Sequence, residues 1–332
     1  MYKVKNKTLY LHIGLHKTGT SAIQSFLGLN LDIFKDMEFF VPTSSSYIMG
    51  DINIHHYIAL AYKNDEKEIQ KKNLKNIIKG SKKSKNIIIS SEVFSESGLN
   101  PIQIFDNFSK IASNIKVIIY LRRQDNQIMS VYNQLVKDGY KEEFMMSNLP
   151  NYELDYFKFL NIWGNIVGKK NIIVCPYEQQ QLYGGNIFSD FMYKALGMEL
   201  INEFKLPKRA LNARLSTSSL EYLRVVNKTN LDKILKRSLI SSLQKYDKEK
   251  MVDSKIVFEE HTLLSPDERD KILNTFSESN KKIAYEYLKR DDGVLFEEAI
   301  KDYSNCQETW EGLIPRDVLD YAFPVINMMS FE

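Results

Sequence analysis

The sequence is poor in cysteine, and this limits the chemistry open to it. Only Cys175 and Cys306 occur among the 332 residues, which provides neither a disulfide framework nor the ligand spacing of a metal site. The apolar run 172–175 predicts that Cys175 is a buried free thiol. Two isolated cysteines are typical of a protein from a reducing compartment.

Long apolar runs and a strong net charge are also missing. No stretch approaches the roughly 20 apolar residues that span a bilayer, and the N-terminus enters a strand without an apolar signal core. The net charge of +3 is weak for this length, which argues against nucleic acid as a partner. We therefore expect a cytoplasmic bacterial protein without a transmembrane segment. Peripheral membrane contact and the oligomeric state stay open.

Apolar strand patterns alternate with helical patterns in the first half of the chain. Nearly continuous apolar runs predict parallel strands covered on both faces, at Thr8–Ile13, Asn86–Ser90, Lys116–Leu121 and Asn171–Val174, with a weaker strand at Phe39–Val41. Helices are expected at Thr20–Phe34, His56–Tyr62, Glu66–Lys79, Pro101–Ile111, Asn126–Lys137 and Tyr152–Val167. The alternation predicts an α/β fold with a P-loop-like three-layer core, in which helices flank a central parallel β-sheet.

The second half of the chain is mainly helical. Apolar residues recur at helical spacing in Asn186–Leu196, Ser216–Asn227, Leu231–Tyr246 and Pro266–Leu288. No linker rich in proline, glycine or serine interrupts the pattern, so we expect one domain over residues 1–332. Its α/β nucleotide-binding core is expected at 1–180 and its mainly helical part at 181–332.

The most informative stretch is Leu9–Gln24, which reads LYLHIGLHKTGTSAIQ. An apolar strand enters a short loop with two glycines and a lysine, and an amphipathic helix follows. Backbone N–H groups and the positive end of the helix dipole converge where such a helix begins, so this arrangement predicts an anion site. The residues expected to hold the anion are His16, Lys17, Thr18, Gly19, Thr20 and Ser21.

The order of the loop residues indicates which kind of phosphate is bound. In a nucleoside-triphosphatase loop the lysine follows the last glycine, whereas Lys17 precedes Gly19 here. The pattern HxGxHKTGT after a strand resembles the 5′-phosphosulfate loop of the sulfotransferase superfamily, in its bacterial carbohydrate-type branch. The resemblance implies 3′-phosphoadenosine 5′-phosphosulfate (PAPS) as donor, adenosine 3′,5′-bisphosphate as product and no metal ion. It also implies that Lys17 stabilises charge on the leaving phosphate.

A second motif follows the strand that ends near Leu121. Arg122 stands at the strand end and Ser130 follows eight residues later, a spacing that resembles the 3′-phosphate site of the same family. The planar guanidinium suits phosphate because it offers two parallel donors. Arg123 is one position late, and which of the two arginines holds the phosphate stays open. Arg214 is a further candidate for the 3′-phosphate or for an acidic acceptor.

The acceptor hydroxyl must lose its proton, so a basic side chain is expected near the strand ends. Glu92 follows an apolar strand, and the sequence SSE there resembles a recurring feature of bacterial sulfotransferases. His55 and His56 stand at the expected start of a helix, and we favour His56 because two adjacent residues do not face the same side of a helix. Glu92 and His56 are alternative general bases.

His12 belongs to the first strand, where side chains alternate between the two faces, and is expected in the core.

These features predict a sulfotransferase that moves a sulfuryl group from PAPS to a hydroxyl by direct in-line displacement. The resemblance points to a bacterial surface saccharide or glycolipid as the acceptor. One alternative is a P-loop-type nucleotide-dependent kinase, against which the displaced lysine and the lack of a Walker B acid weigh. The other is a non-catalytic relative that binds a saccharide or a partner protein.

Overall fold

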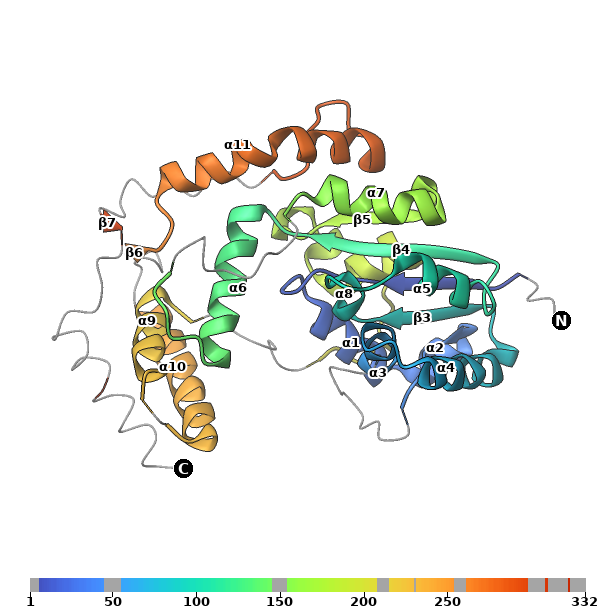
Figure 1. Cartoon of the computed structure of the whole chain (residues 1–332), viewed down its shortest axis with the longest axis horizontal. Helices are drawn as coiled ribbons and strands as arrows, with labels where there is room; N and C mark the ends of the chain where they lie inside the picture. Colours follow the sequence, from blue (N-terminus) through green and yellow to red (C-terminus); the bar gives the residue numbers. More distant parts are fainter. Residues whose placement is uncertain are drawn as a thin grey trace. The chain divides into compact units, whose positions relative to one another are not determined.

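Figure 1 shows the chain as a computed structural model. The structure describes residues 6–44, 55–144, 154–207, 215–229, 231–253, 261–297, 308–309 and 322. The chain divides into two compact units. Unit 1 comprises Met1–Arg123, Glu153–Leu211 and Phe276–Glu298, and unit 2 comprises Gln124–Tyr152, Asn212–Thr275 and Ala299–Glu332. The organisation of residues 1–332 as one domain stays a prediction.

Unit 1 is built on a five-stranded sheet in the order β2-β3-β1-β4-β5, and all of its pairings are parallel. The strands are β1 (Thr8–His12), β2 (Phe39–Phe40), β3 (Asn86–Ser90), β4 (Asn114–Leu121) and β5 (Ile172–Pro176). β1 lies in the centre, where Leu9 stands opposite Ile87 of β3 and Ile115 of β4. The carboxyl ends of β1, β3 and β4 therefore lie next to one another at one edge.

Each face of this sheet is covered by its own set of helices. One core cluster joins Leu11, Ile89 and Ile119 to helices α3 (His56–Lys63), α4 (Lys67–Gly80), α5 (Pro101–Phe108) and α7 (Tyr156–Val167). The other joins Tyr10 and Ile118 to helices α1 (Thr20–Leu29) and α2 (Leu31–Asp36) and to the π-helical segment η7 (Phe191–Ala195) that follows α8 (Ile187–Asp190). The predicted three-layer α/β fold is thereby confirmed, and Cys175 is a buried free thiol as expected.

Short 3-10 and π-helical segments complete unit 1. The 3-10 turns are η1 (Ser81–Lys83), η2 (Glu92–Ser95), η4 (Lys169–Asn171), η5 (Gln179–Gln181) and η6 (Tyr183–Gly185). A π-helical turn, η8 (Ala284–Leu288), follows helix α11 (Pro266–Ile283), which crosses from unit 2 into unit 1. The predicted start of α11 is confirmed, since Glu268 N–H donates to Ser265 Oγ and Ser265 N–H donates to the Glu268 carboxylate.

Unit 2 contains helices α6 (Gln124–Asp138), α9 (Thr217–Val226) and α10 (Lys233–Asp253) and the short parallel pair β6 (His261–Thr262) and β7 (Glu308–Thr309). Buried polar contacts connect its helices. Tyr132 Oη on α6 donates to Glu221 on α9 at 2.6 Å, and Asp247 on α10 accepts from the hydroxyls of Ser216 and Ser219 at the start of α9. The mainly helical character predicted for this part is confirmed.

One helix differs from its prediction. The pattern predicts a single helix over Thr20–Phe34, but the structure interrupts it at Asn30. The Asn30 amide group donates to Phe26 O at 2.7 Å and to Lys205 O at 2.9 Å, and Oδ1 accepts from Lys205 N–H at 2.8 Å. Because an asparagine side chain competes with the helical backbone, these three bonds favour the break.

No helix in the described part of the chain is long and apolar enough to cross a membrane.

Replacing Asn30 tests this explanation. Asn30→Ala removes three hydrogen bonds of a side chain that is itself 2% exposed, so we expect the free energy of unfolding in urea to fall by about 3 kcal/mol. Asn171→Ala is the matched control, since Asn171 Nδ2 makes one similar bond, to Val167 O at 2.6 Å. Its cost should be about 1 kcal/mol. Equal losses in the two variants would contradict the explanation.

Candidate functional site

The loop between β1 and α1 follows an unusual backbone path. Lys17 has φ 67° and Gly19 has φ 83°, so both lie in the left-handed region. Glycine adopts this conformation without cost, but at a lysine it costs roughly 1–2 kcal/mol. The Thr18 hydroxyl is buried and donates to Leu15 O at 2.7 Å. This bond helps to hold the strained turn.

The first turn of α1 is suited to an anion. Its N-cap is Gly19, no side chain caps it, and its first turn carries no acidic residue. The N–H groups of such a turn and the helix dipole favour negative charge. Gly19 is favoured by its backbone, because φ 83° is strained for any other residue, and an added Cβ at Gly14 would lie 2.4 Å from Thr20 Oγ1, so that this side chain would have to shift. The loop and the start of the helix thus form a compact backbone cradle.

A second cation lies against this loop. Arg122, at the end of β4, donates from Nη1 to Lys17 O at 3.3 Å, and its guanidinium carbon lies 6.0 Å from the centre of the Tyr177 ring. Arg123 is buried, at 4% exposure. The loop after β1 and the residue after β4 are therefore in contact, as their topology predicts.

The other two predicted phosphate ligands are Ser130 and Arg214. Ser130 lies on α6, in unit 2, and is buried, whereas Arg122 belongs to unit 1. Their joint contact with one phosphate stays a prediction. Arg214 lies outside the described residues.

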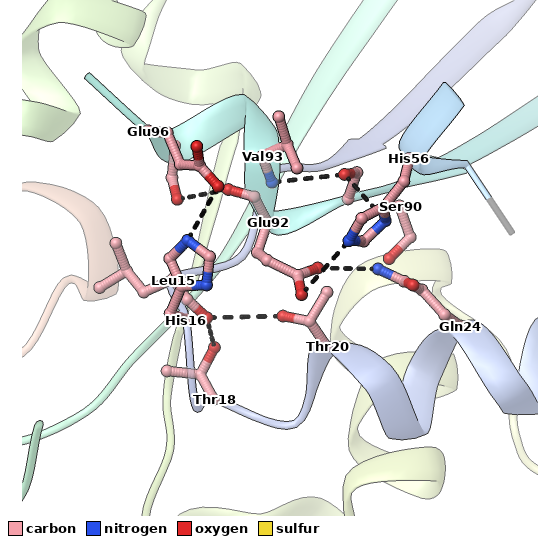
Figure 2. A network of polar contacts seen from close by, with 12 residues as sticks. Leu15, His16, Thr18, Thr20, Gln24, His56, Ser90, Glu92, Val93 and Glu96 are labelled. Carbon is pink, nitrogen blue, oxygen red and sulfur yellow. Dashed lines mark hydrogen bonds and ion pairs between the residues drawn. The ribbon is translucent and has the colours of Figure 1, made fainter. Parts of the chain in front are cut away.

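The segment after β3 brings Glu92 next to α1 and α3 (Figure 2). Glu92 Oε2 accepts a hydrogen bond from Gln24 Nε2 at 2.9 Å, and Oε1 lies 3.6 Å from His56 Nε2. The other ring nitrogen of His56 lies 3.3 Å from Ser91 Oγ. The structure thus brings the two predicted general bases together as a pair, with side chains that are 15% and 20% exposed.

This environment keeps Glu92 ionised. Burial by itself would raise the pKa of the carboxyl group, but interaction with His56 outweighs burial and lowers the pKa to about 2. The charge of His16 acts in the same direction. At neutral pH, Glu92 therefore presents a carboxylate that accepts hydrogen bonds.

Two further histidines are buried beneath this pair. His12 Nδ1 lies 2.8 Å from Ser90 Oγ, and His55 Nδ1 accepts from Ser90 N–H at 3.1 Å. Burial lowers the pKa of His12 to about 4 and that of His55 to about 3. Both rings are therefore neutral in the folded protein at pH 7. His12 is a core residue, as expected.

His16 is connected to a separate acidic residue. Its Nε2 lies 3.1 Å from Glu96 Oε1 (Figure 2). Lys63 of α3 pairs with the same carboxylate. The segment after β3 is thus joined to the loop between β1 and α1, which we call the anion loop, by His16. It is joined to α1 by Gln24. His55 and His56 face different partners, and no group of three His, Cys, Asp or Glu within the described ranges could hold a metal ion.

Sequence reasoning missed Gln24 and Glu96. Gln24 stands among Ile23, Phe26 and Leu27 on the buried side of α1, and a polar residue on an apolar helix face could have indicated a buried polar contact. Glu96 carries no comparable signal, because its role depends on where α3 and the anion loop meet in space.

The buried histidines predict a loss of stability in acid. Below the unfolded pKa of 6.5, the unfolded chain binds a proton that the folded chain cannot accept at His55 until about pH 3. Stability is therefore complete above pH 6.5 and falls as the pH drops. His55→Asn keeps an acceptor for Ser90 N–H but cannot bind this proton. Between pH 7 and pH 5, the free energy of unfolding in urea should therefore decrease by about 2 kcal/mol less in His55→Asn than in the wild type. Identical pH dependence in both proteins would contradict this account.

Comparisons with known proteins give two similarities. An uncharacterised protein from Archaeoglobus fulgidus is 30% identical over 239 residues, which cover 71% of this chain and 62% of that protein. The chain thus matches less than two thirds of that relative's length. A crystal structure of a sulfotransferase from Alicyclobacillus acidocaldarius is 14% identical, covers 69% of this chain and 98% of that chain, and superposes with a TM-score of 0.37. No model of a protein family matches the chain.

Proposed function

We propose that this protein is a sulfotransferase that moves the sulfuryl group of PAPS to a hydroxyl of an acceptor. The observation that carries the proposal is Lys17, held in a left-handed backbone conformation at the entry to α1 and in contact with Arg122. Lys17 and Arg122 follow the carboxyl ends of neighbouring strands, and the uncapped N–H groups of α1 begin just after Lys17. Two cationic residues and helix N–H groups suit a nucleotide with two anionic groups.

The strain at Lys17 supports a functional reason for this residue. A glycine at position 17 would adopt φ 67° more easily than a lysine. A lysine is consistent with a need for its side-chain charge, since strained residues persist where they serve function. The acid-free first turn of α1 agrees with the same role.

The residues of the loop fit the donor by their chemistry. PAPS supplies an activated sulfuryl group whose leaving group is a phosphate. Lys17 and the N–H groups of Thr18, Gly19, Thr20 and Ser21 would stabilise the charge that develops on that phosphate. Arg122 is the arginine proposed for the 3′-phosphate, because it contacts the loop at Lys17 O; Arg123 is the alternative. Ser130 and Arg214 are proposed as further ligands of the same nucleotide.

Glu92 and His56 are proposed to act on the acceptor as a pair. The acceptor oxygen forms a bond to sulfur, the bond from sulfur to the phosphate oxygen breaks, and the hydroxyl proton leaves. The ionised Glu92 accepts this proton, and His56 Nε2, 3.6 Å from the carboxylate, is the alternative group that accepts it. Neither residue forms a covalent intermediate.

Nucleotide binding tests the proposal with a pair of lysine variants. Lys17→Gly removes the charge but relieves the backbone, so we expect unchanged or slightly higher stability and a 10–100-fold weaker affinity for adenosine 3′,5′-bisphosphate. Lys289→Gly is the control, since Lys289 also has a positive φ, of 57°, and its Nζ donates to Glu286 O in the preceding π-helical turn. Its affinity should equal that of the wild type. Isothermal titration without magnesium measures both.

Other results would redirect the assignment. Binding of ATP with Mg²⁺ in place of adenosine 3′,5′-bisphosphate would indicate the nucleotide-dependent kinase. Binding of neither nucleotide by the wild type would favour the non-catalytic relative.

We further propose that the acceptor is a carbohydrate, on a bacterial surface saccharide or glycolipid. In cells that depend on the Lys17→Gly variant, extracted glycans should lack a sulfate, about 80 Da per group, that is present with the Lys289→Gly variant. Mass spectrometry of the glycans measures the difference. Identical glycan masses in the two strains would exclude a carbohydrate acceptor among those extracted.

A further inference from the structure

Gln24 is a polar residue at a buried position, which lowers stability unless its side chain is fully hydrogen-bonded. It lies on α1, one helical turn after Thr20, and is completely buried. Its Nε2 donates to Glu92 Oε2 at 2.9 Å (Figure 2). Within the part of the chain that the structure describes, no donor reaches its Oε1. A buried acceptor without a partner destabilises a protein.

The orientation of this amide is fixed by Glu92. Because Nε2 faces the carboxylate, Oε1 must point away, where it has no partner among the described residues. Turning the amide would place two acceptors against each other. An apolar residue such as methionine would fill similar space without the unpartnered oxygen. The contact with Glu92 is therefore what this glutamine contributes.

The contact also connects two parts of the candidate site. The N-terminus of α1 forms the anion cradle, and Gln24 is on the same rigid helix. Glu92 lies on the 3-10 turn after β3, and it is held by Gln24 on Oε2 while His56 faces Oε1. The position of the carboxylate relative to the cradle is thus set through Gln24.

We propose that Gln24 is a positioning residue that fixes the Glu92 carboxylate relative to the anion loop. This inference rests on the proposed sulfotransferase function. Effective proton transfer requires the base within hydrogen-bond reach of the attacking hydroxyl, and a displacement of about 1 Å can cost a hundredfold in rate. Gln24 itself does not touch the reacting atoms.

The test compares Gln24→Met with Gln70→Met in the full chain. Gln70 is the matched control, because it is a buried helical glutamine, 3% exposed, whose Nε2 donates to Ala61 O at 3.0 Å. The probe reaction is hydrolysis of PAPS. The oxygen of water forms a bond to sulfur, the bond from sulfur to the 5′-phosphate oxygen breaks, and the water proton passes to Glu92. The products are sulfate and adenosine 3′,5′-bisphosphate.

We expect Gln24→Met to lower the hydrolysis rate about 10–100-fold while the affinity for adenosine 3′,5′-bisphosphate changes less than threefold. Gln70→Met should leave both unchanged. A second readout needs no turnover. Carbon-13 labelling of glutamate carboxyl groups reports the titration of Glu92 by nuclear magnetic resonance. The Glu92 signal is identified as the one that is missing from the spectrum of Glu92→Gln. Loss of the hydrogen bond should raise the pKa of Glu92 in Gln24→Met and not in Gln70→Met.

The outcomes separate the two proposals. If the wild type does not bind adenosine 3′,5′-bisphosphate, the proposed function is wrong, and the Glu92 titration still decides whether Gln24 acts on the carboxylate. If the wild type binds it but Gln24→Met matches Gln70→Met in the Glu92 titration, the positioning role is overturned and the proposed function stands. An unchanged hydrolysis rate in Gln24→Met would overturn it as well.

Discussion

The hydrogen bonding of β1 to β3 on one side and to β4 on the other is the constraint on which the candidate site depends. All three strands are parallel, so their carboxyl ends lie at the same edge of the sheet. The anion loop leaves β1, Glu92 follows β3, and Arg122 follows β4. The contacts between these segments, His12 O with Ser91 N–H and Lys17 O with Arg122, are consequences of that strand order. A different neighbour for β1 would separate the cation from the carboxylate.

The buried histidines add no charge near this edge at neutral pH, because burial lowers the pKa of His12 to about 4 and that of His55 to about 3. Glu92 has the opposite behaviour, since its pKa of about 2 keeps it ionised. The arrangement leaves Lys17 and Arg122 as cations of the loop and strand end, and Glu92 as the anion across from them. Such a separation of sign is what a reaction between a negatively charged donor and a hydroxyl requires.

Much of the fold was predictable because it depends on local pattern. The apolar runs predict the five strands within two residues, and the predicted helix start at His56 agrees with the start of α3. The break at Asn30 was not predictable, because it is caused by Lys205, which is far away in the sequence. The same reason applies to the contacts Gln24–Glu92 and His16–Glu96, which join residues 68 and 80 positions apart. The resemblance of the loop to sulfotransferases indicated Lys17, but only the structure shows that its backbone is strained.

Two features of the site work against stability, and both involve the segment around α1. Lys17 holds a left-handed backbone conformation that glycine would adopt more easily, and Gln24 keeps a buried oxygen unpartnered among the described residues. Unit 1 contains such groups elsewhere as well: Glu38, Asp65 and Lys289 have a positive φ, and the side chains of His12, His55 and Tyr62 each keep a buried atom without a partner among the described residues. The two features around α1 matter because both belong to one stretch of eight residues in the candidate site, and functional sites are where a chain departs from local preference. The two costs arise within residues 17–24, one in the proposed anion loop and one beside the proposed base. This fits a site in which the start of α1 holds the anion and its second turn fixes the base.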